Sequence, residues 1–367
     1  MPMHRRDLLR TAGLVAAGGA VTSGCGRGQH RAAAASELVV TDQRGVRVTL
    51  NQPARRIVAI VFPAAAMVMA VDSGPEHIVG VHDAAAAAIK QGILGEIFPK
   101  AKRIPSGVAD QDFTPNVESV VALDPDVVVQ WGDRGSGITA PLQDAGLNVI
   151  GLKYGTQSDL EAWLGIFGTM LGKRRRARQM VEAMHAALAD IRTSAPKTGR
   201  RPRVLYFNHL QGGLEVGGKA TYNDFYIKLV GGINPAERVN GLGMVDTEQV
   251  IAWDPDVILL GNFDDTVPKD IFDRADWKGL SAVRSRRVYK VPLGGYRWDP
   301  PNQESILMWR WLSMIAYPNA TKFDLRGQLI KEYLFLYSYH PSSSQIDKIL
   351  WSGPNAGSAG YRRFNAG

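Results

Sequence analysis

Residues 157–194, QSDLEAWLGIFGTMLGKRRRARQMVEAMHAALADIRTS, separate two stretches of the chain that repeat each other. The first repeat is NVESVVALDPDVVV at 116–129, and the second is DTEQVIAWDPDVIL at 246–259. Glu118 aligns with Glu248, and the two Asp-Pro-Asp segments align at the same offset. Two similar α/β halves joined by a helical region predict two lobes with a ligand cleft between them.

The joining region carries an apolar stripe at helical spacing between Leu160 and Leu188, with Gly172 as a point where the helix could break or bend. We interpret the stripe as a surface that packs against the lobes, not as a cofactor site. The basic run at 173–176 is interpreted as a solvated helix face. One long rigid helix here would restrict hinge opening between the lobes.

The chain has 367 residues, 45% hydrophobic content and a formal net charge of +8. Each half is long enough to bury its own core. The basic residues are scattered along the chain, which argues against a nucleic-acid partner. A mild positive excess favours anionic ligands or a nearby anionic surface.

Residues 1–24 have the composition of a targeting segment and are kept apart from the fold. Arg5 and Arg6 precede an apolar, small-residue run, a pattern similar to a twin-arginine export signal. Cys25, the only cysteine, follows a stretch similar to a lipoprotein cleavage box, although Thr22 stands where that box usually has Leu. We expect lipidation of Cys25, a tether at 25–36, and attachment to the outer face of the cytoplasmic membrane.

Strands alternate with helices on both sides of the joining region. This pattern predicts an N-terminal lobe at 37–156 and a C-terminal lobe at 195–318, each with a Rossmann-like, mostly parallel sheet. A C-terminal helical appendage is expected at 319–367. Ligands of such sheets lie beyond the carboxyl ends of the strands, which draws attention to Phe62, Trp131 and Arg134. The plainer alternatives are core packing for Trp131 and a surface charge for Arg134.

With these features together, the chain resembles the substrate-binding proteins of ABC importers, in the class with a rigid interlobe helix that binds iron–siderophores and cobalamin. The resemblance covers about residues 37–318. It rests on TDQRGVRVTL at 41–50, the two repeats, GGIN at 231–234, and the segment from Glu304 to Pro318.

The resemblance implies that one glutamate on each lobe docks onto arginines of the membrane permease, and the matching positions are Glu118 and Glu248. Each lies in the first turn of a predicted helix, after the expected N-caps Asn116 and Asp246. A carboxylate there is stabilised by the helix dipole by about 0.3–1 kcal/mol, so it also needs no partner.

The resemblance also implies a ligand held between the lobes. An arginine between two aromatic residues, as in the segment 296–298, suits an anionic, partly planar metal chelate. We expect no direct metal ligand from the protein, no cofactor and no catalytic residue. The expected ligand-binding set is Phe62, Trp131, Arg134, Tyr154, His209, Tyr222, Tyr296, Arg297 and Trp298.

The first hypothesis is therefore a monomeric, exported, lipid-anchored binding protein that delivers an iron–siderophore-type chelate to an ABC permease. Cobalamin, haem, and molybdate or tungstate are alternative ligands within the same class. From other classes, an enzyme or chelatase and a non-transport surface sensor could use the same scaffold.

Overall fold

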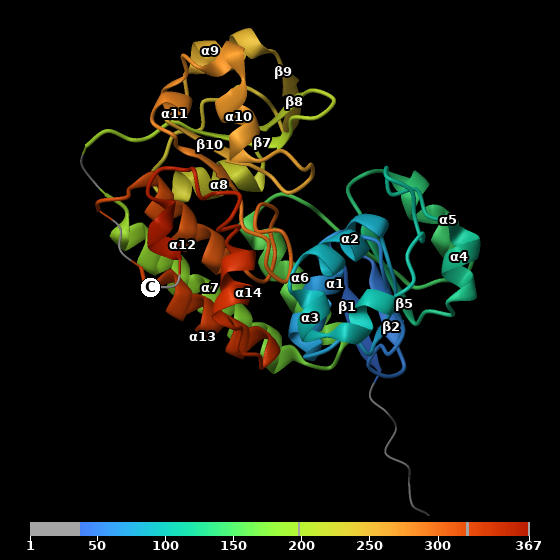
Figure 1. Cartoon of the computed structure of the whole chain (residues 1–367). Helices are drawn as coiled ribbons and strands as arrows, with labels where there is room; N and C mark the ends of the chain where they lie inside the picture. Colours follow the sequence, from blue (N-terminus) through green and yellow to red (C-terminus); the bar gives the residue numbers. More distant parts are fainter. Residues whose placement is uncertain (1–36, 197–198, 321–322, 366–367) are drawn as a thin grey trace, which may run out of the picture. The chain divides into compact units, whose positions relative to one another are not determined.

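The computed structural model describes residues 37–196, 199–320 and 323–365 (Figure 1). The export segment, Cys25 and the tether lie outside the described residues, so those predictions stay untested. Among the helices that are described, none combines the length and the apolar character needed to cross a membrane.

The N-terminal lobe begins with the expected hairpin and continues into a fully parallel sheet. The hairpin strands β1 and β2 pair with Leu38 opposite Leu50. Every residue of β3 and β5 is buried, as strands covered on both faces require. The hairpin is β1 (Leu38–Thr41) and β2 (Arg47–Leu50), and the sheet order is β4 (Ile78–Val81), β3 (Ile57–Ala59), β5 (Val127–Trp131) and β6 (Val149–Leu152).

The C-terminal lobe has a mixed sheet, which corrects the expectation of a mostly parallel one. Three strands are parallel, but β8 and β9 are added antiparallel at one edge. Each of these two strands lies in a glycine-rich stretch, GGLEVGG at 212–218 and GLGMV at 241–245, and neither stretch carries a clear strand signal in the sequence. The order is β11 (Val288–Lys290), β10 (Val257–Leu260), β7 (Val204–His209), β8 (Leu214–Gly217) and β9 (Leu242–Val245).

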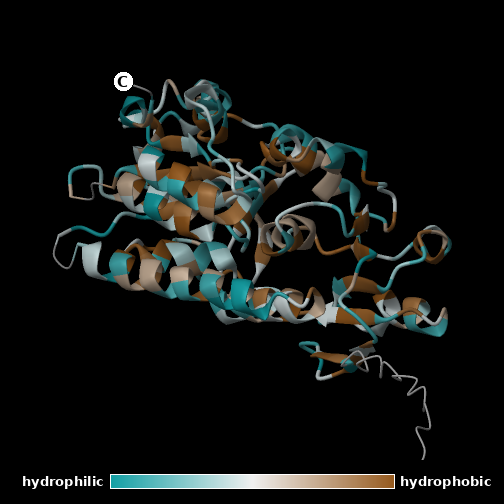
Figure 2. Cartoon of the chain, turned by 90° about the horizontal axis from the view of Figure 1, so that it is seen from below, coloured by the Kyte–Doolittle hydropathy of each residue, from teal (hydrophilic) through white to brown (hydrophobic). Residues whose placement is uncertain are grey.

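Short helices follow the strands of both lobes (Figure 1). In Figure 2 the helices carry alternating hydrophilic and hydrophobic bands, as expected for helices that bury one face. The N-terminal lobe has α1 (Ala64–Asp72), α2 (Asp83–Gln91), α3 (Leu94–Ile97), α4 (Val117–Ala122) and α5 (Ala140–Asp144). The C-terminal lobe has α8 (Tyr222–Leu229), α9 (Thr247–Trp253), α10 (Pro268–Asp273), α11 (Ser281–Arg284) and α12 (Ser305–Ala316). Single 3₁₀ turns lie at Pro99–Arg103, Ser136–Ile138, Ala275–Trp277 and Tyr361–Phe364.

The region between the lobes is helical as expected, but it is a hairpin of two helices and not one rod. α6 (Gln157–Met170) ends before Gly172, whose φ of +67° lies in the left-handed region that favours glycine. α7 (Arg174–Ser194) then runs back alongside it, so that His185 Nε2 lies 3.0 Å from Glu161 Oε2. α6 packs on the N-terminal lobe, and α7 continues to α8 and α12 of the other lobe.

The basic run at the start of α7 is only partly solvated, which corrects its interpretation as a solvated face. Arg174 and Arg175 are exposed. Lys173 Nζ pairs with Asp72 Oδ1 of α1 at 2.7 Å, and Arg176 stacks on the ring of Phe335 at 4.2 Å. These two side chains fasten α7 to its neighbours.

The C-terminal segment, expected as a helical appendage, packs against the rest of the fold. It contains α13 (Leu325–Tyr337) and α14 (Ser343–Ile349), drawn in red in Figure 1. α13 packs on α12 and on α1 of the N-terminal lobe. α14 sends Gln345 to Glu96 of α3, with 2.9 Å between Nε2 and Oε2. The segment therefore contacts both lobes.

The two sequence repeats fold in the same way. Asn116 and Asp246 cap α4 and α9 through their side chains, as expected. Asp124 and Asp254 both take left-handed backbone conformations, with φ of 44° and 38°. Each repeat thus forms the same helix, turn and strand.

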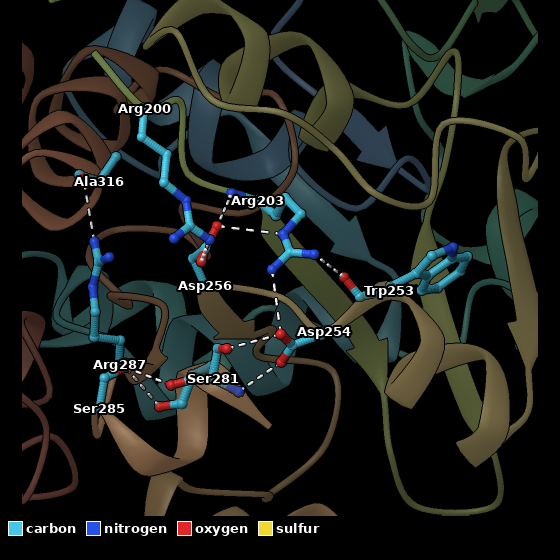
Figure 3. A network of polar contacts seen from close by, with 10 residues as sticks. Arg200, Arg203, Trp253, Asp254, Asp256, Ser281, Ser285, Arg287 and Ala316 are labelled. Atoms are coloured by element: carbon cyan, nitrogen blue, oxygen red, sulfur yellow. Dashed lines mark hydrogen bonds and ion pairs between the residues drawn. The ribbon is translucent and has the colours of Figure 1, made fainter. Parts of the chain in front are cut away.

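The second aspartate of each Asp-Pro-Asp segment anchors the first parallel strand of its lobe. Asp126 Oδ2 accepts from the amide N–H groups of Arg55 and Arg56 at 2.6 and 2.9 Å. Asp256 Oδ2 accepts from the amide N–H of Arg203 at 2.8 Å (Figure 3). The side chains of Arg56 and Arg203 add a second link, since they donate to the carbonyl oxygens at the ends of α4 and α9.

Replacing Asp256 with alanine should lower the free energy of unfolding by about 1–3 kcal/mol, because buried donors lose their acceptor. Chemical denaturation of the purified chain measures this. Asp273→Ala is the matched control, since Asp273 is 62% exposed and its ion-pair partner is Lys269 on the same helix. Equal, small effects of the two substitutions would contradict the anchoring role.

Candidate functional site

A cavity of about 730 Å³ lies between the lobes, within the usual size range of small-molecule sites. Residues that follow the carboxyl ends of strands line it. Phe62 follows β3, Tyr154 follows β6, and Phe263 follows β10. Both lobes therefore contribute to the site, at the place where open α/β sheets bind ligands.

Seven of the nine expected ligand-binding residues line this cavity. They are Phe62, Trp131, Arg134, Tyr154, His209, Tyr296 and Arg297. They come from loops far apart in the sequence, and the fold brings them together.

Tyr222 and Trp298 do not line the cavity, so their predicted placement there is wrong. Tyr222 is fully buried in the first turn of α8, and its hydroxyl donates to Gln157 Oε1 at 2.9 Å. Trp298 is also fully buried, and its Nε1 donates to Glu304 Oε2 at 2.7 Å. Both are structural residues behind the site.

Two arginines from opposite lobes reach the cavity over aromatic rings. Arg134 Cζ lies 4.4 Å from the ring centroid of Phe113 and 5.2 Å from that of Trp131. Arg297 Cζ lies 4.8 Å from the ring centroid of Phe263. Each guanidinium is held by cation–π contact, and the N–H groups that make no hydrogen bond within the protein remain available to a ligand.

Neither arginine forms an ion pair with a carboxylate in the part of the chain that the structure describes. Arg297 is 6% exposed and donates to the carbonyl oxygens of Asn262 and Ala84, at 2.8 and 3.1 Å. Burial lowers the pKa of the Arg134 guanidinium, but an arginine stays charged at neutral pH. The cavity therefore holds two positive charges that are not neutralised by contact with a carboxylate.

Three carboxylates line the cavity, those of Asp83, Asp110 and Asp299, and the buried one is already engaged by the protein. Asp299 is fully buried, and its Oδ2 accepts from the Tyr206 hydroxyl at 2.8 Å and from the Asn262 amide N–H at 3.1 Å. Burial raises the pKa of the Tyr206 phenol, so Tyr206 stays a neutral donor. These bonds occupy the Asp299 carboxylate, whereas Asp83 and Asp110 are exposed.

The histidines of the wall differ in role. His82 caps α2, since its Nδ1 accepts from Ala84 N at 3.0 Å, and its Nε2 therefore donates to Asp110 O at 2.7 Å. Both ring nitrogens are used, and His82 contributes an aromatic face. The side chain of His209 is 41% exposed, with Nε2 3.7 Å from Glu215 Oε2, so it can turn toward a ligand. Within the described ranges, no group of three or more His, Cys, Asp or Glu residues could hold a metal ion.

Sequence reasoning missed four aromatic wall residues, His82, Phe113, Tyr206 and Phe263. His82 and Phe263 follow β4 and β10, so the rule that selected Trp131 could have found them. Phe113 lies in an irregular loop with φ of +68° and carries no sequence signal. It is nevertheless central, because Phe62, His82, Trp131 and Arg134 all pack against it.

The two lobes are also bonded directly to each other on one side of the cavity. Ile93 N donates to Gly294 O at 3.0 Å, and Arg297 donates to Ala84 O across the same boundary. The contact of α14 with Glu96 lies on the C-terminal segment beside them. These bonds join the two walls on this side of the cavity.

Comparison with known proteins agrees with this architecture. Residues 100–293 match the family model described as periplasmic binding protein. A solved periplasmic solute binding protein from Veillonella parvula is 32% identical, with a TM-score of 0.78 over 87% of this chain and 98% of that one. The molybdate-binding protein MolA of Haemophilus influenzae is 23% identical over 85% of this chain and 94% of its own length. The Fe(3+) dicitrate-binding periplasmic protein FecB of Escherichia coli is 24% identical over 69% and 81%.

The chain belongs to the periplasmic binding protein family. Proteins of this family bind small molecules outside the cytoplasm and deliver them to ABC permeases, so this chain is the substrate-binding component of an ABC transporter. The relatives named here are binding proteins and not enzymes, in line with the expectation of no catalytic residue.

Asp299→Ala should destabilise the chain by about 2–4 kcal/mol, because buried donors of Tyr206 and Asn262 lose their charged acceptor. Thermal or chemical denaturation measures the loss. Asp83→Ala is the matched control, since Asp83 also lines the cavity but is exposed. An Asp299→Ala protein as stable as the control would show that this carboxylate does not hold the wall.

Proposed function

We propose that this protein captures an anionic, partly planar metal chelate of the iron–siderophore type and delivers it to the permease. The observation that carries the proposal is the pair of arginines, Arg134 and Arg297, stacked on aromatic rings at opposite walls of one cavity. Guanidinium groups held in this way bind carboxylate or oxygen-rich anions, while aromatic faces cover flat apolar surface. The ligand brings its metal already chelated.

The size of the cavity supports a chelate over a bare ion. A space of about 730 Å³ accommodates a ligand of drug size. A single tetrahedral oxyanion fills only a small part of it. The similarity to FecB, named for Fe(3+) dicitrate binding, points the same way.

Molybdate is the second candidate, favoured by the similarity to MolA over most of both chains. The same two arginines suit an oxyanion. The two candidates differ in the use they make of the aromatic wall, because a bare oxyanion needs the charges but not the rings.

Titration of the purified chain with ferric citrate, ferric hydroxamate and catecholate siderophores, cobalamin, haem and molybdate tests the proposal. Trp131 is in the wall, so a bound chelate should quench tryptophan fluorescence at one equivalent. Saturation by a ferric chelate supports it. Selective binding of molybdate transfers the assignment to the second candidate, and no binding of any member overturns both.

Arg134→Gln and Arg297→Gln should each weaken binding of the ferric chelate about 10- to 100-fold, since charge-assisted hydrogen bonds contribute about 1.5–3 kcal/mol. Isothermal calorimetry measures the change. Arg284→Gln is the control, because Arg284 is exposed and lies outside the cavity. Affinities like that of the control would remove the arginines from the site. Melting temperatures show whether Arg297→Gln also disturbs its loop.

We further propose that Glu118 and Glu248 dock onto the permease. Both are exposed in the first turns of the equivalent helices α4 and α9. Lipidation of Cys25, with anchoring at the outer face of the cytoplasmic membrane, remains part of the proposal, as does a monomeric binding protein.

The double variant Glu118→Ala, Glu248→Ala should keep its ligand affinity within about twofold, because both carboxylates lie outside the cavity. Uptake of radioactive iron by cells carrying the variant should fall strongly. Glu182→Ala with Asp273→Ala removes two other exposed carboxylates and controls for net charge. Uptake equal to that of this control would count against docking.

A further inference from the structure

The loop from Leu293 to Asp299 carries three residues of the cavity wall, yet it has little regular structure. Tyr296, Arg297 and Asp299 line the cavity. Within the loop, one isolated bridge pairs Leu293 with Arg297. The family match ends at residue 293, just where this loop begins. Because the loop has little regular structure of its own, its position depends on contacts with groups outside it.

One buried carboxylate, that of Glu304, binds the loop on one side and helix α13 on the other. Glu304 is 1% exposed. Its Oε1 accepts from Gly295 N at 2.9 Å and from the Tyr337 hydroxyl at 2.6 Å. Its Oε2 accepts from Trp298 Nε1 at 2.7 Å and from the Tyr333 hydroxyl at 3.2 Å. Each oxygen thus joins one donor of the loop to one donor of α13.

The glycine pair of the loop is required by this arrangement. A Cβ at Gly294 would lie 2.0 Å from Glu304 Oε2, and a Cβ at Gly295 would lie 2.5 Å from Glu304 Oε1. Neither position has room for any side chain. The backbone at 294–295 therefore passes directly over the carboxylate, and Arg297 is fixed between the two contact points at Gly295 and Trp298.

We propose that Glu304 is a positioning residue for the ligand site: in its ionised form it clamps the loop to α13 and so sets the place of Arg297. This proposal rests on the proposed function of the cavity as an anion site. It gives the C-terminal segment a role in ligand affinity, since Tyr333 and Tyr337 supply half of the clamp.

The surroundings make the clamp sensitive to pH. Burial raises the pKa of Glu304 to about 7, against the four hydrogen bonds that lower it. Burial also raises the pKa of the Tyr333 and Tyr337 phenols, so both remain neutral donors. The other polar neighbours are Gln303, which donates to the Tyr337 hydroxyl, and Arg176 of α7, a cation that acts on Tyr337.

Protonation converts an acceptor-only carboxylate into a group with its own O–H donor. Four donors then face fewer acceptor sites, and the clamp loosens. Because the pKa in the folded chain lies above the ordinary value, protonation of Glu304 also stabilises the fold as the pH falls from about 7 toward 4.5. Protonation of Glu304 by itself would therefore not unfold the chain in that range.

The test uses the whole chain with ferric citrate as the probe, at pH values from 8 to 5.5. Tyr333→Phe and Tyr337→Phe each remove one donor and should weaken binding about 3- to 10-fold at pH 8. Tyr361→Phe is the matched control, because Tyr361 is a buried tyrosine of the same segment whose hydroxyl donates to Leu350 O instead. As the pH is lowered from 8 to 5.5, the affinity of the wild type should decrease more steeply than that of Glu304→Gln, in which this titration is absent.

Equal affinities of the two variants and the Tyr361→Phe control, or the same pH profile for wild type and Glu304→Gln, would overturn the proposal. If the wild type binds no ferric chelate, the proposed ligand fails, but the clamp is still tested. The difference in fluorescence between wild type and Trp298→Phe should then titrate near neutral pH, and that titration should vanish with Glu304→Gln. Its persistence would rule out the clamp.

Discussion

The rest of the structure depends on the hydrogen bonds that one aspartate in each lobe accepts from backbone N–H groups. Asp126 and Asp256 tie the first parallel strand of a lobe to the turn before the strand that pairs with it. A strand displaced by one residue would turn its buried side chains to the wrong face. The register fixed here places Phe62 and His209 at the ends of those strands, and so in the wall of the cavity.

Because both lobes use the same anchor, their strand ends face one cavity and their repeated helices present equivalent surfaces. The ligand is then selected by what the loops carry, and not by the lobes themselves. In this chain the loops carry two arginines over aromatic rings and a buried carboxylate, Asp299, that already accepts hydrogen bonds from the protein. Relatives similar to this chain carry names for molybdate and Fe(3+) dicitrate binding.

Much of this architecture could be predicted from the sequence, because it follows from local patterns. The repeats, the N-caps at Asn116 and Asp246, and the buried apolar strands have local causes. The strand-end rule pointed to Phe62, Trp131 and Arg134, and the resemblance added four further residues that also line the cavity. The misses have tertiary causes: Tyr222 and Trp298 are aromatic residues near the site, but their polar atoms bond to Gln157 and Glu304 behind it. The helical hairpin and the antiparallel edge strands likewise depend on packing that periodicity does not show.

The bonds between the lobes have a consequence for the kinetics of capture. Rotation of one lobe away from the other would break the contacts of Ile93 with Gly294 and of Arg297 with Ala84. Such contacts favour a preformed cavity, in which the proposed anionic ligand meets the two arginines without waiting for a slow rearrangement. Arrival is then governed by diffusion and charge steering, and related ligands are distinguished by how long they stay.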